Sequence, residues 1–218
     1  MKLWLLRSAL TGLAGIAITA GAVAGTTTYQ LDKPHTEVAF KVRHIFTKVP
    51  GRFTDFSGDI HFDEKNLENS SVAVTIQAAS IFTDNERRDK HLKSADFFEV
   101  EKFPTLTFKS TKVTKGDGEG FQIEGDLTIH GVTKTVVLDA EFLGQGAIAV
   151  GGNAMGNRAG FEASTRINRK DFGILWNRTL DQGGLMVGDD VDIILNVEAV
   201  LMEEKPAAAS EEKTKKSD

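Results

Sequence analysis

The sequence predicts an all-β protein in which antiparallel strands share one apolar face. Three observations lead to this fold class: apolar and polar residues alternate along several segments, turn signals lie between neighbouring segments, and only one segment has a strong helical pattern. Alternation with a period of two places successive side chains on opposite faces of a strand. Because the outward positions are mostly polar, we expect a sheet that is wetted on one side and covers a core on the other.

Seven or eight long strands are predicted between Glu37 and Leu201. Turn signals at Lys115-Gly-Asp-Gly-Glu-Gly120 and His130-Gly131 join neighbouring strands as hairpins. The residues predicted to face inward are Val38, Phe40 and Val42; Phe56, Ile60 and Phe62; Val72, Val74 and Ile76; Leu106 and Phe108; Phe121, Ile123, Leu127 and Ile129; Val136, Leu138, Ala140 and Phe142; and Val191, Ile193, Leu195, Val197, Ala199 and Leu201.

One helical insertion is predicted around residues 84–99. The residues from Thr83 to Asn85 can cap its first turn, and Ser94 is the predicted cap of a second helical start. Pro104 then returns the chain to an extended conformation. A shorter helical turn is predicted around residues 168–172.

Long strands of this kind can form three architectures. The last strand has about 11 residues and is therefore about 36 Å long. Eight such strands could close into a lipocalin-like barrel around one ligand or flatten into a sandwich with a solid core, and closure is favoured because it removes exposed edges. An outer-membrane barrel is disfavoured, since its polar face would be dense in charged residues and a chain with one Tyr lacks aromatic girdles.

The two ends of the chain are predicted to lie outside this domain. Residues 1–24 have the pattern of a cleavable signal peptide: Lys2 and Arg7 precede an apolar run that ends at Ala22-Val-Ala24. An uncleaved anchor is the alternative, since about 20 residues could span a bilayer. Residues 203–218 contain no large apolar residue and are predicted to be a disordered charged tail. Residues 26–202 are predicted to form one β-barrel domain.

The composition excludes several kinds of site. The chain has no cysteine, which removes disulfides, thiolate zinc sites, cysteine nucleophiles and iron–sulfur clusters. Without the leader, 24 basic and 31 acidic residues remain, and an acidic protein without basic runs is a poor candidate for binding nucleic acid or anionic lipid headgroups. Fourteen Phe against one Tyr and two Trp indicate a dry interior, because Phe brings no polar atom that needs a partner.

Catalytic and metal-binding motifs are also missing from the sequence. It contains no Gly-x-Ser-x-Gly elbow, no HExxH helix, no phosphate-binding loop and no dinucleotide fingerprint after a strand. His44, His61 and His91 could meet as metal ligands, but without close spacing or a thiolate we interpret them as structural. We therefore predict no catalytic residue, no metal site and no cofactor.

Several short motifs in unbroken order carry a family resemblance. They are Phe40-Lys-Val-Arg-His44, Val49-Pro-Gly-Arg-Phe53, Phe56-Ser-Gly58, Arg88-Asp-Lys-His-Leu92-Lys-Ser-Ala-Asp-Phe-Phe98, Phe103-Pro104, Gly125-Asp-Leu-Thr-Ile-His-Gly-Val-Thr-Lys134, Ala159-Gly-Phe-Glu162, Arg169-Lys-Asp-Phe-Gly-Ile174, Trp176-Asn177 and Val187-Gly-Asp-Asp-Val191. From about Tyr29 to Met202 the chain resembles the polyisoprenoid-binding YceI-like family. One departure is Pro50, where a less constrained residue is expected before Gly51; it leaves the geometry of that turn open.

The resemblance implies a fold, a ligand and a location. The fold is an extended, lipocalin-like, eight-stranded antiparallel β-barrel, and the ligand is a long isoprenoid chain, such as a quinone tail or a polyprenyl phosphate, held in an apolar tunnel. Export to the periplasm also suits the family. Such a tunnel needs apolar walls and a few polar groups at one mouth.

Candidate ligand-binding residues follow from that requirement. Arg88 and His91 of the helical insertion could donate hydrogen bonds to a headgroup; alternatively, Arg88 and Asp89 pin the insertion to the barrel. Each apolar wall candidate has an equally simple interpretation as core. The candidates are Phe40, His44, Phe56, Phe62, Arg88, His91, Phe97, Phe98, Phe108, Phe121, Phe142, Phe161, Phe172 and Trp176, with Val197 as a further wall residue.

Three functional classes stay open on the sequence alone. The first is a non-catalytic periplasmic carrier or store of an isoprenoid lipid or another amphiphile, bound mainly by burial of its tail at about 25 cal/mol per Å². The second is an enzyme that acts on a lipid inside the barrel, and the third is a stress-related structural protein. A transient membrane contact and a homodimer are compatible with each of them.

Overall fold

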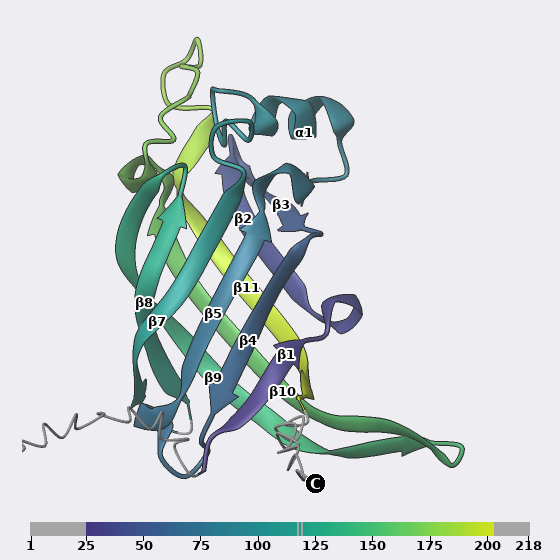
Figure 1. The fold of residues 1–218 in the computed structure, drawn as a ribbon. Helices are drawn as coiled ribbons and strands as arrows, with labels where there is room; N and C mark the ends of the chain where they lie inside the picture. The colour runs from purple at the N-terminus through teal and green to yellow at the C-terminus, as the bar shows by residue number, and fades with distance from the viewer. Residues whose placement is uncertain (1–24, 117, 119, 203–218) are drawn as a thin grey trace, which may run out of the picture.

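The strands form one closed antiparallel barrel, crossed at one end by a helical insertion (Figure 1). The protein is represented by a computed structural model that describes residues 25–116, 118 and 120–202. The predicted signal peptide (1–24) and charged tail (203–218) lie outside the described residues. The strands are β1 (Thr27–Leu31), β2 (Glu37–His44), β3 (Thr47–Phe53), β4 (Phe56–Phe62), β5 (Ser71–Gln77), β6 (Ile81–Phe82), β7 (Thr105–Lys115), β8 (Phe121–Ile129), β9 (Val132–Val150), β10 (Asn153–Asn168) and β11 (Val187–Leu201).

The helical elements of the described chain are short. The one α-helix is α1 (Glu86–Lys93), and the 3₁₀ helices are η1 (Lys33–His35), η2 (Leu67–Asn69), η3 (Ala78–Ser80) and η4 (Arg169–Phe172). In this part of the chain no helix has both the length and the apolar character needed to cross a bilayer.

Eight strand positions close the barrel. Neighbours follow the order β1-β4-β5-β7-β8-β9-β10-β11, and β11 also pairs with β1, which completes the ring. Two positions are extended by a second strand: β2 continues β1 along β11, and β3 continues β4 along β2. The expected eight-stranded antiparallel barrel is confirmed, and the sandwich alternative is excluded because β11 and β1 leave no open edge between them.

The burial of alternate residues confirms the predicted inward faces. In β8, Phe121, Leu127 and Ile129 are buried, whereas Gln122 and Asp126 are exposed. The turn that follows β8 consists of two residues with positive φ, 52° and 75°, which is the geometry of a tight hairpin. The predicted His130-Gly131 hairpin is therefore confirmed.

The segment around Pro50, interpreted from the sequence as a turn, is a strand. Pro50 lies within β3 and pairs with Lys41 of β2. Its missing N–H is tolerated because the other edge of β3 pairs only at Arg52 and Phe53, with β6. The proline therefore stands at an edge position, where the ladder does not need its donor.

The insertion contains one α-helix rather than two. The side chain of Asn85 caps α1 by accepting a hydrogen bond from the backbone N–H of Arg88 at 2.9 Å, as the sequence predicts. Ser94 does not begin a second helix; it follows the last turn of α1, and residues 95–98 form turns. The second predicted helical turn is η4, which is capped by the side chain of Asn168.

β9 and β10 extend further than the barrel requires. The pairing of β9 with β8 ends at Ala140, and the pairing of β10 with β11 begins at Arg158. Residues 141–157 therefore project from the barrel as a two-stranded ribbon (Figure 1). We did not predict this ribbon, because glycine and alanine interrupt its alternation.

A cluster of ion pairs holds the bend between β1 and β2 against the barrel wall. The guanidinium of Arg158, on β10, contacts the carboxylates of Asp32 and Glu198. The His35 ring nitrogen Nδ1 lies 2.9 Å from the same Asp32 oxygen, Oδ2, that Arg158 contacts. The hydrogen bond from Arg158 holds the pKa of Asp32 below its usual range.

We predict that this cluster makes stability depend on acid pH. Because the folded-state pKa of Asp32 is lowered, its carboxylate stabilises the fold above the unfolded-state pKa of about 3.9, and this contribution is lost as the pH falls through the folded-state pKa. Asp32→Asn should lower the melting temperature at neutral pH by about 2–4 °C. The difference from the wild type should shrink below a pH of about 3.9.

Thermal unfolding followed by circular dichroism through an acid series measures this difference. Asp59→Asn is the matched control, because Asp59 is exposed on β4 and forms no ion pair among the described residues. If the melting temperature of Asp32→Asn stayed below that of the wild type by a constant amount into strong acid, Asp32 would not be the source of this pH dependence.

Candidate functional site

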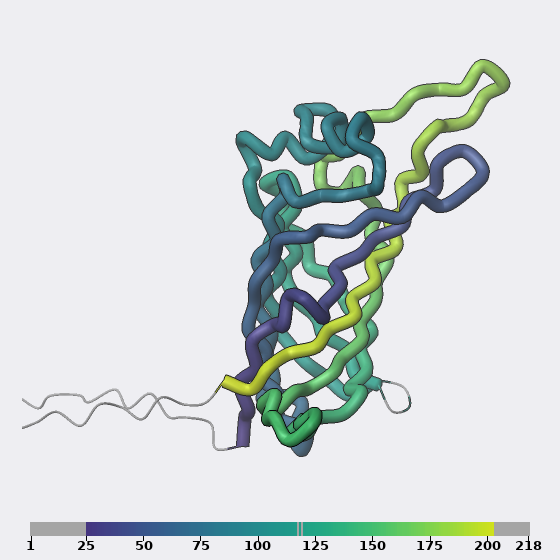
Figure 2. The backbone as a smooth tube through the Cα atoms, turned by 90° about the vertical axis from the view of Figure 1, so that its right-hand side faces the viewer, coloured from purple at the N-terminus to yellow at the C-terminus, as the bar shows by residue number. Residues whose placement is uncertain are grey.

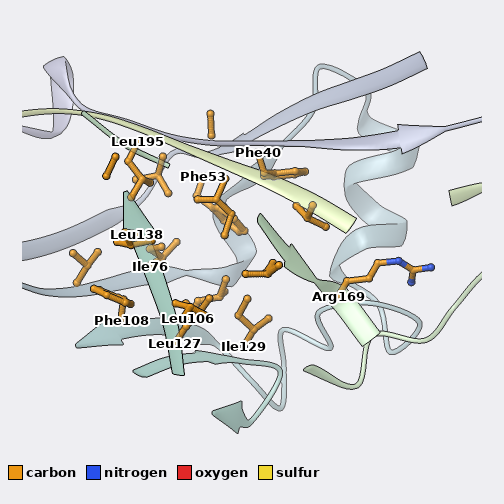
Figure 3. A pocket seen from close by; sticks show the side chains of 18 of the residues that line it. Phe40, Phe53, Ile76, Leu106, Phe108, Leu127, Ile129, Leu138, Arg169 and Leu195 are labelled. Carbon is orange, nitrogen blue, oxygen red and sulfur yellow. The ribbon is translucent and has the colours of Figure 1, made fainter. Parts of the chain in front are cut away.

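A cavity of about 790 Å³ lies inside the barrel. Figure 3 shows apolar side chains around it from separate strands, among them Phe40 of β2, Ile76 of β5, Phe108 of β7, Leu138 of β9 and Leu195 of β11. The volume falls in the range of about 300–1,000 Å³ that is typical of small-ligand pockets. The inward residues of the barrel therefore line a space rather than fill it.

Aromatic rings close the end of the barrel remote from α1. The ring centroid of Phe62 lies 4.8 Å from that of Phe142 and 5.1 Å from that of Phe161. Phe121 lies 6.1 Å from Phe62. We call these four residues the aromatic plug. The plug presents only carbon to the cavity, so a polar headgroup would find no hydrogen-bond partner among these rings.

Most of the predicted ligand-binding residues surround the cavity. Phe56 and Phe142 do not line it: Phe56 is buried in the packing around it, and Phe142 belongs to the aromatic plug. Those that line it are Phe40, His44, Phe62, Arg88, His91, Phe97, Phe98, Phe108, Phe121, Phe161, Phe172 and Trp176, together with Val197.

A close approach to glycine fixes the ring of Phe40. Gly51 pairs with Phe40 across β2 and β3, and a Cβ atom at Gly51 would lie 2.3 Å from the Cζ atom of that ring. The Phe40 ring is 5.8 Å from that of Phe53, which is 5.8 Å from that of Phe98. This row of rings connects the barrel wall to the insertion, so the shape of the cavity depends on both.

Thr83 anchors the insertion through two charged neighbours. The guanidinium of Arg88 donates to the Thr83 hydroxyl at 2.7 Å and to its carbonyl at 2.6 Å. The carboxylate of Asp89 accepts from the Thr83 N–H at 3.0 Å and from the hydroxyl at 2.5 Å. These contacts favour the interpretation that Arg88 and Asp89 pin the insertion, and they leave only Nη1 of Arg88 without a hydrogen bond in the described chain.

His91 is also engaged within the insertion. Its Nε2 atom lies 2.8 Å from the carboxylate of Asp96. Its ring packs edge-on against Trp176 at 4.8 Å and against Phe97 at 5.0 Å. His91 therefore joins the α1 region to the segment after η4, and these three rings cover the α1 end of the cavity.

Arg169, which the sequence analysis did not single out as a site residue, organises the segment after η4. Its buried guanidinium donates to the carbonyls of Gly188 at 2.9 Å and of Ile174 and Trp176 at 2.8 Å, and it lies 3.3 Å from the carboxylate of Asp189. Burial lowers the pKa of Arg169, although the guanidinium stays protonated. Figure 3 shows it at one end of the apolar lining.

Arg87 is a second residue that we did not predict. It lies on α1, is exposed and lines the cavity beside exposed Asn85. Within the described residues it forms no ion pair. The sequence offered only a weak signal that Arg87 is unpaired. Lys90 and His91 follow it by three and four positions, so no acidic residue stands where it could form an ion pair with Arg87 along the helix.

One cluster in the described chain has the residue types of a metal site. Ligand atoms of Asp32, His35 and Glu198 lie within 4.8 Å of one another. The guanidinium of Arg158 contacts both carboxylates, so it already supplies the positive charge that a metal ion would bring. These residues therefore fit an ion-pair cluster better than a cation site.

Comparisons with known proteins agree with the fold and with the sequence motifs. A UPF0312 protein of Enterobacter sp. (strain 638) is 45% identical over 203 residues, covering 92% of this chain and 98% of that protein. The crystal structure of a Campylobacter jejuni YCEI protein matches with a TM-score of 0.61 at 37% identity, covering 80% of this chain and 97% of that one.

A more distant structure shares the fold. It is described as a polyisoprenoid binding domain from Saccharophagus degradans implicated in plant cell wall breakdown, and it matches with a TM-score of 0.55 at 14% identity, over 81% of this chain and 99% of that one. The model of the YceI-like domain family matches residues 29–199. This match and the identity of the Enterobacter relative establish that the chain belongs to the YceI-like family.

Proposed function

We propose that this protein binds a long-chain isoprenoid lipid, of the polyprenyl phosphate or quinone type, inside the barrel and carries or stores it in the periplasm. The observation that carries the proposal is the 790 Å³ cavity with apolar walls. An apolar space of this size costs stability if it stays empty, because its lining loses dispersion contacts. A hydrocarbon chain would restore those contacts without requiring any polar partner.

The chemistry of the lining supports binding rather than catalysis. Thr83, Arg88 and Asp89 are engaged with one another, and His91 is engaged by Asp96. Groups that are held in this way position the insertion and are not arranged as a nucleophile with a base. The distant structural neighbour, described as a polyisoprenoid binding domain, supports the same class of ligand for this fold.

The polar groups suggest which way the lipid lies. The aromatic plug offers only carbon, whereas exposed Arg87 and the Nη1 atom of Arg88 lie at the α1 end. Guanidinium groups bind phosphate oxygens with charge-assisted hydrogen bonds. We therefore place the headgroup at α1 and the tail toward the plug.

The proposed location rests on the first residues of the chain. Two basic residues, an apolar run and a small-x-small pattern at Ala22-Val-Ala24 support export and cleavage, and hence a periplasmic site of action.

Blocking the middle of the cavity should prevent lipid binding. Ala163 faces inward on β10 and packs against both buried clusters, the one near α1 and the one that includes the plug. In Ala163→Phe the ring should occupy the space needed by a long tail. We expect the isoprenoid recovered with protein purified from its own host to fall at least about tenfold, as measured by mass spectrometry of an organic extract.

Ser164→Phe provides the matched control, because Ser164 is the next residue on β10 and is exposed. It should retain the lipid. Circular dichroism should show both variants folded, since the added ring at 163 enters open space. Equal recovery from the two variants, or recovery of no lipid from the wild type together with no binding of added polyprenols or quinones, would count against the proposal.

We predict that Arg87 contacts the headgroup of the bound lipid. Arg87→Gln removes a charge that lines the cavity, so we expect the affinity for a polyprenyl phosphate to fall about fivefold, while the affinity for the uncharged polyprenol stays unchanged. Displacement of a fluorescent fatty probe measures both affinities.

Lys90→Gln removes a charge of the same sign from α1 at an exposed position outside the cavity lining. It should leave both affinities unchanged. If the phosphate and the alcohol lost affinity equally in Arg87→Gln, or if Lys90→Gln had the same effect, Arg87 would not be the headgroup contact.

A further inference from the structure

Exposed apolar side chains gather beside the α1 end of the barrel. Phe46, in the turn between β2 and β3, is 99% exposed, Leu175 is 65% exposed and Leu185 is 38% exposed. Leu175 and Leu185 belong to residues 175–186, which connect η4 to β11 as a small projecting hairpin. Single exposed apolar residues are common, but a group of them marks an interaction site.

The two projections are joined to each other. The N–H of Ile45 donates to the carbonyl of Met186 at 2.9 Å. His44 also pairs with Val187, the first residue of β11. Figure 2 shows the β2–β3 turn and the 175–186 hairpin projecting on the same side of the molecule, next to the α1 insertion. We call Phe46, Leu175 and Leu185, the exposed apolar residues that these two joined projections carry, the apolar tip.

The turn at Phe46 exposes an apolar side chain and contains a residue with a strained backbone conformation. Ile45 has a φ of 54°, a left-handed conformation that β-branched residues rarely adopt. Asn or Gly would suit such a turn better and would expose no apolar surface. Strain and exposure at one turn are the kind of local conflict that accompanies function.

The apolar tip adjoins the α1 end of the cavity. His44, Met186 and Val187, which connect the two projections, all line the cavity, and so does Trp176, the residue after Leu175. A hydrophobic surface beside this end of the cavity would let a lipid tail pass between the bilayer and the cavity without crossing water. The location therefore favours a membrane over a soluble partner.

The charges around the tip favour anionic lipid. Arg43, Arg87 and Arg178 lie at this end, and the ion pairs of the described residues include none of them. Exposed Asp181 and Glu86 are the acidic residues closest to them in sequence and oppose them in part. The chain as a whole has a net charge of −5, but no ion pair of the described residues neutralises these three arginines, so they are available to lipid phosphates.

The other exposed apolar region lacks this combination. The β9–β10 ribbon exposes Leu143, Ile148, Val150 and Met155, but residues 142–157 contain no Lys or Arg. It also projects from the end of the barrel opposite α1 (Figure 1).

We propose that the apolar tip, flanked by Arg43, Arg87 and Arg178, docks the protein on a bilayer that contains anionic phospholipid, with the α1 end of the cavity against the headgroups. This inference rests on the proposed lipid binding and names the partner from which the cavity is loaded or emptied. Phe46 enters the interface, and the arginines contact lipid phosphates.

Flotation of the purified protein with lipid vesicles tests this docking. The wild type should float with vesicles of phosphatidylcholine and phosphatidylglycerol and should bind vesicles of phosphatidylcholine alone more weakly. Phe46→Ser/Leu175→Ser should weaken binding at least about tenfold, because two apolar side chains no longer enter the interface. Arg43→Gln/Arg178→Gln should remove the dependence on phosphatidylglycerol.

Leu143→Ser/Ile148→Ser on the ribbon is the matched control, and it should float like the wild type. A wild type that does not float, a tip variant that floats fully, or a ribbon variant that fails instead would each overturn the proposal. Conversion of a wild-type dimer to a monomer by Phe46→Ser would overturn it too, because the tip would then be covered by a second copy.

The extracted lipid separates this inference from the proposed function. The tip variant should still carry isoprenoid when it is purified from the host, because neither of its substituted side chains lines the cavity. Retained lipid with full flotation of the tip variant would overturn the docking surface alone. Loss of lipid from every form of the protein would instead contradict the proposed function.

Discussion

An apolar lumen that the protein's own side chains do not fill is the constraint on which the rest of this structure depends. Closing eight strand positions removes the open edges of the barrel body and leaves an interior that inward side chains only partly occupy. Phe suits those positions because it supplies area without a polar atom. The walls cannot close further without breaking the ladder, and water gains few hydrogen bonds inside. The fold is therefore completed most favourably by a hydrocarbon ligand.

The two ends of the lumen are built from different interactions. At the far end, Phe62 and its aromatic neighbours pack with aliphatic side chains such as Val113 and Leu201 and close the barrel. At the α1 end, closure relies on polar anchors: Thr83 is bound by Arg88 and Asp89, and Arg169 gathers backbone carbonyls of the segment that carries Trp176. This asymmetry gives the cavity one apolar end and one end where charge can meet a headgroup or a membrane.

Alternation along the strands was sufficient to predict which side chains share the inward face, whereas the choice of a closed barrel over a sandwich rested on the edge argument and on the family resemblance. The sequence was less informative where contacts between distant segments determine the position of a residue. Pro50 is acceptable in β3 only because that edge is largely unpaired, and Phe142 belongs to the plug rather than the cavity lining because its ring packs against those of Phe62 and Phe161. We did not predict Arg87 or Arg169 as site residues. The role of each depends on contacts with other parts of the chain, and alternation along a strand does not reveal such contacts.

The central claim is that the lumen holds a lipid chain. A crystal structure of the protein purified from its own host tests this most directly. If a lipid is bound, we expect continuous tubular electron density along the cavity, from Arg87 at the α1 end, past Phe108, to the aromatic plug. The strands of the barrel wall should keep the positions described above. A lumen filled by repacked side chains, or one that contains only separate ordered waters, would contradict it.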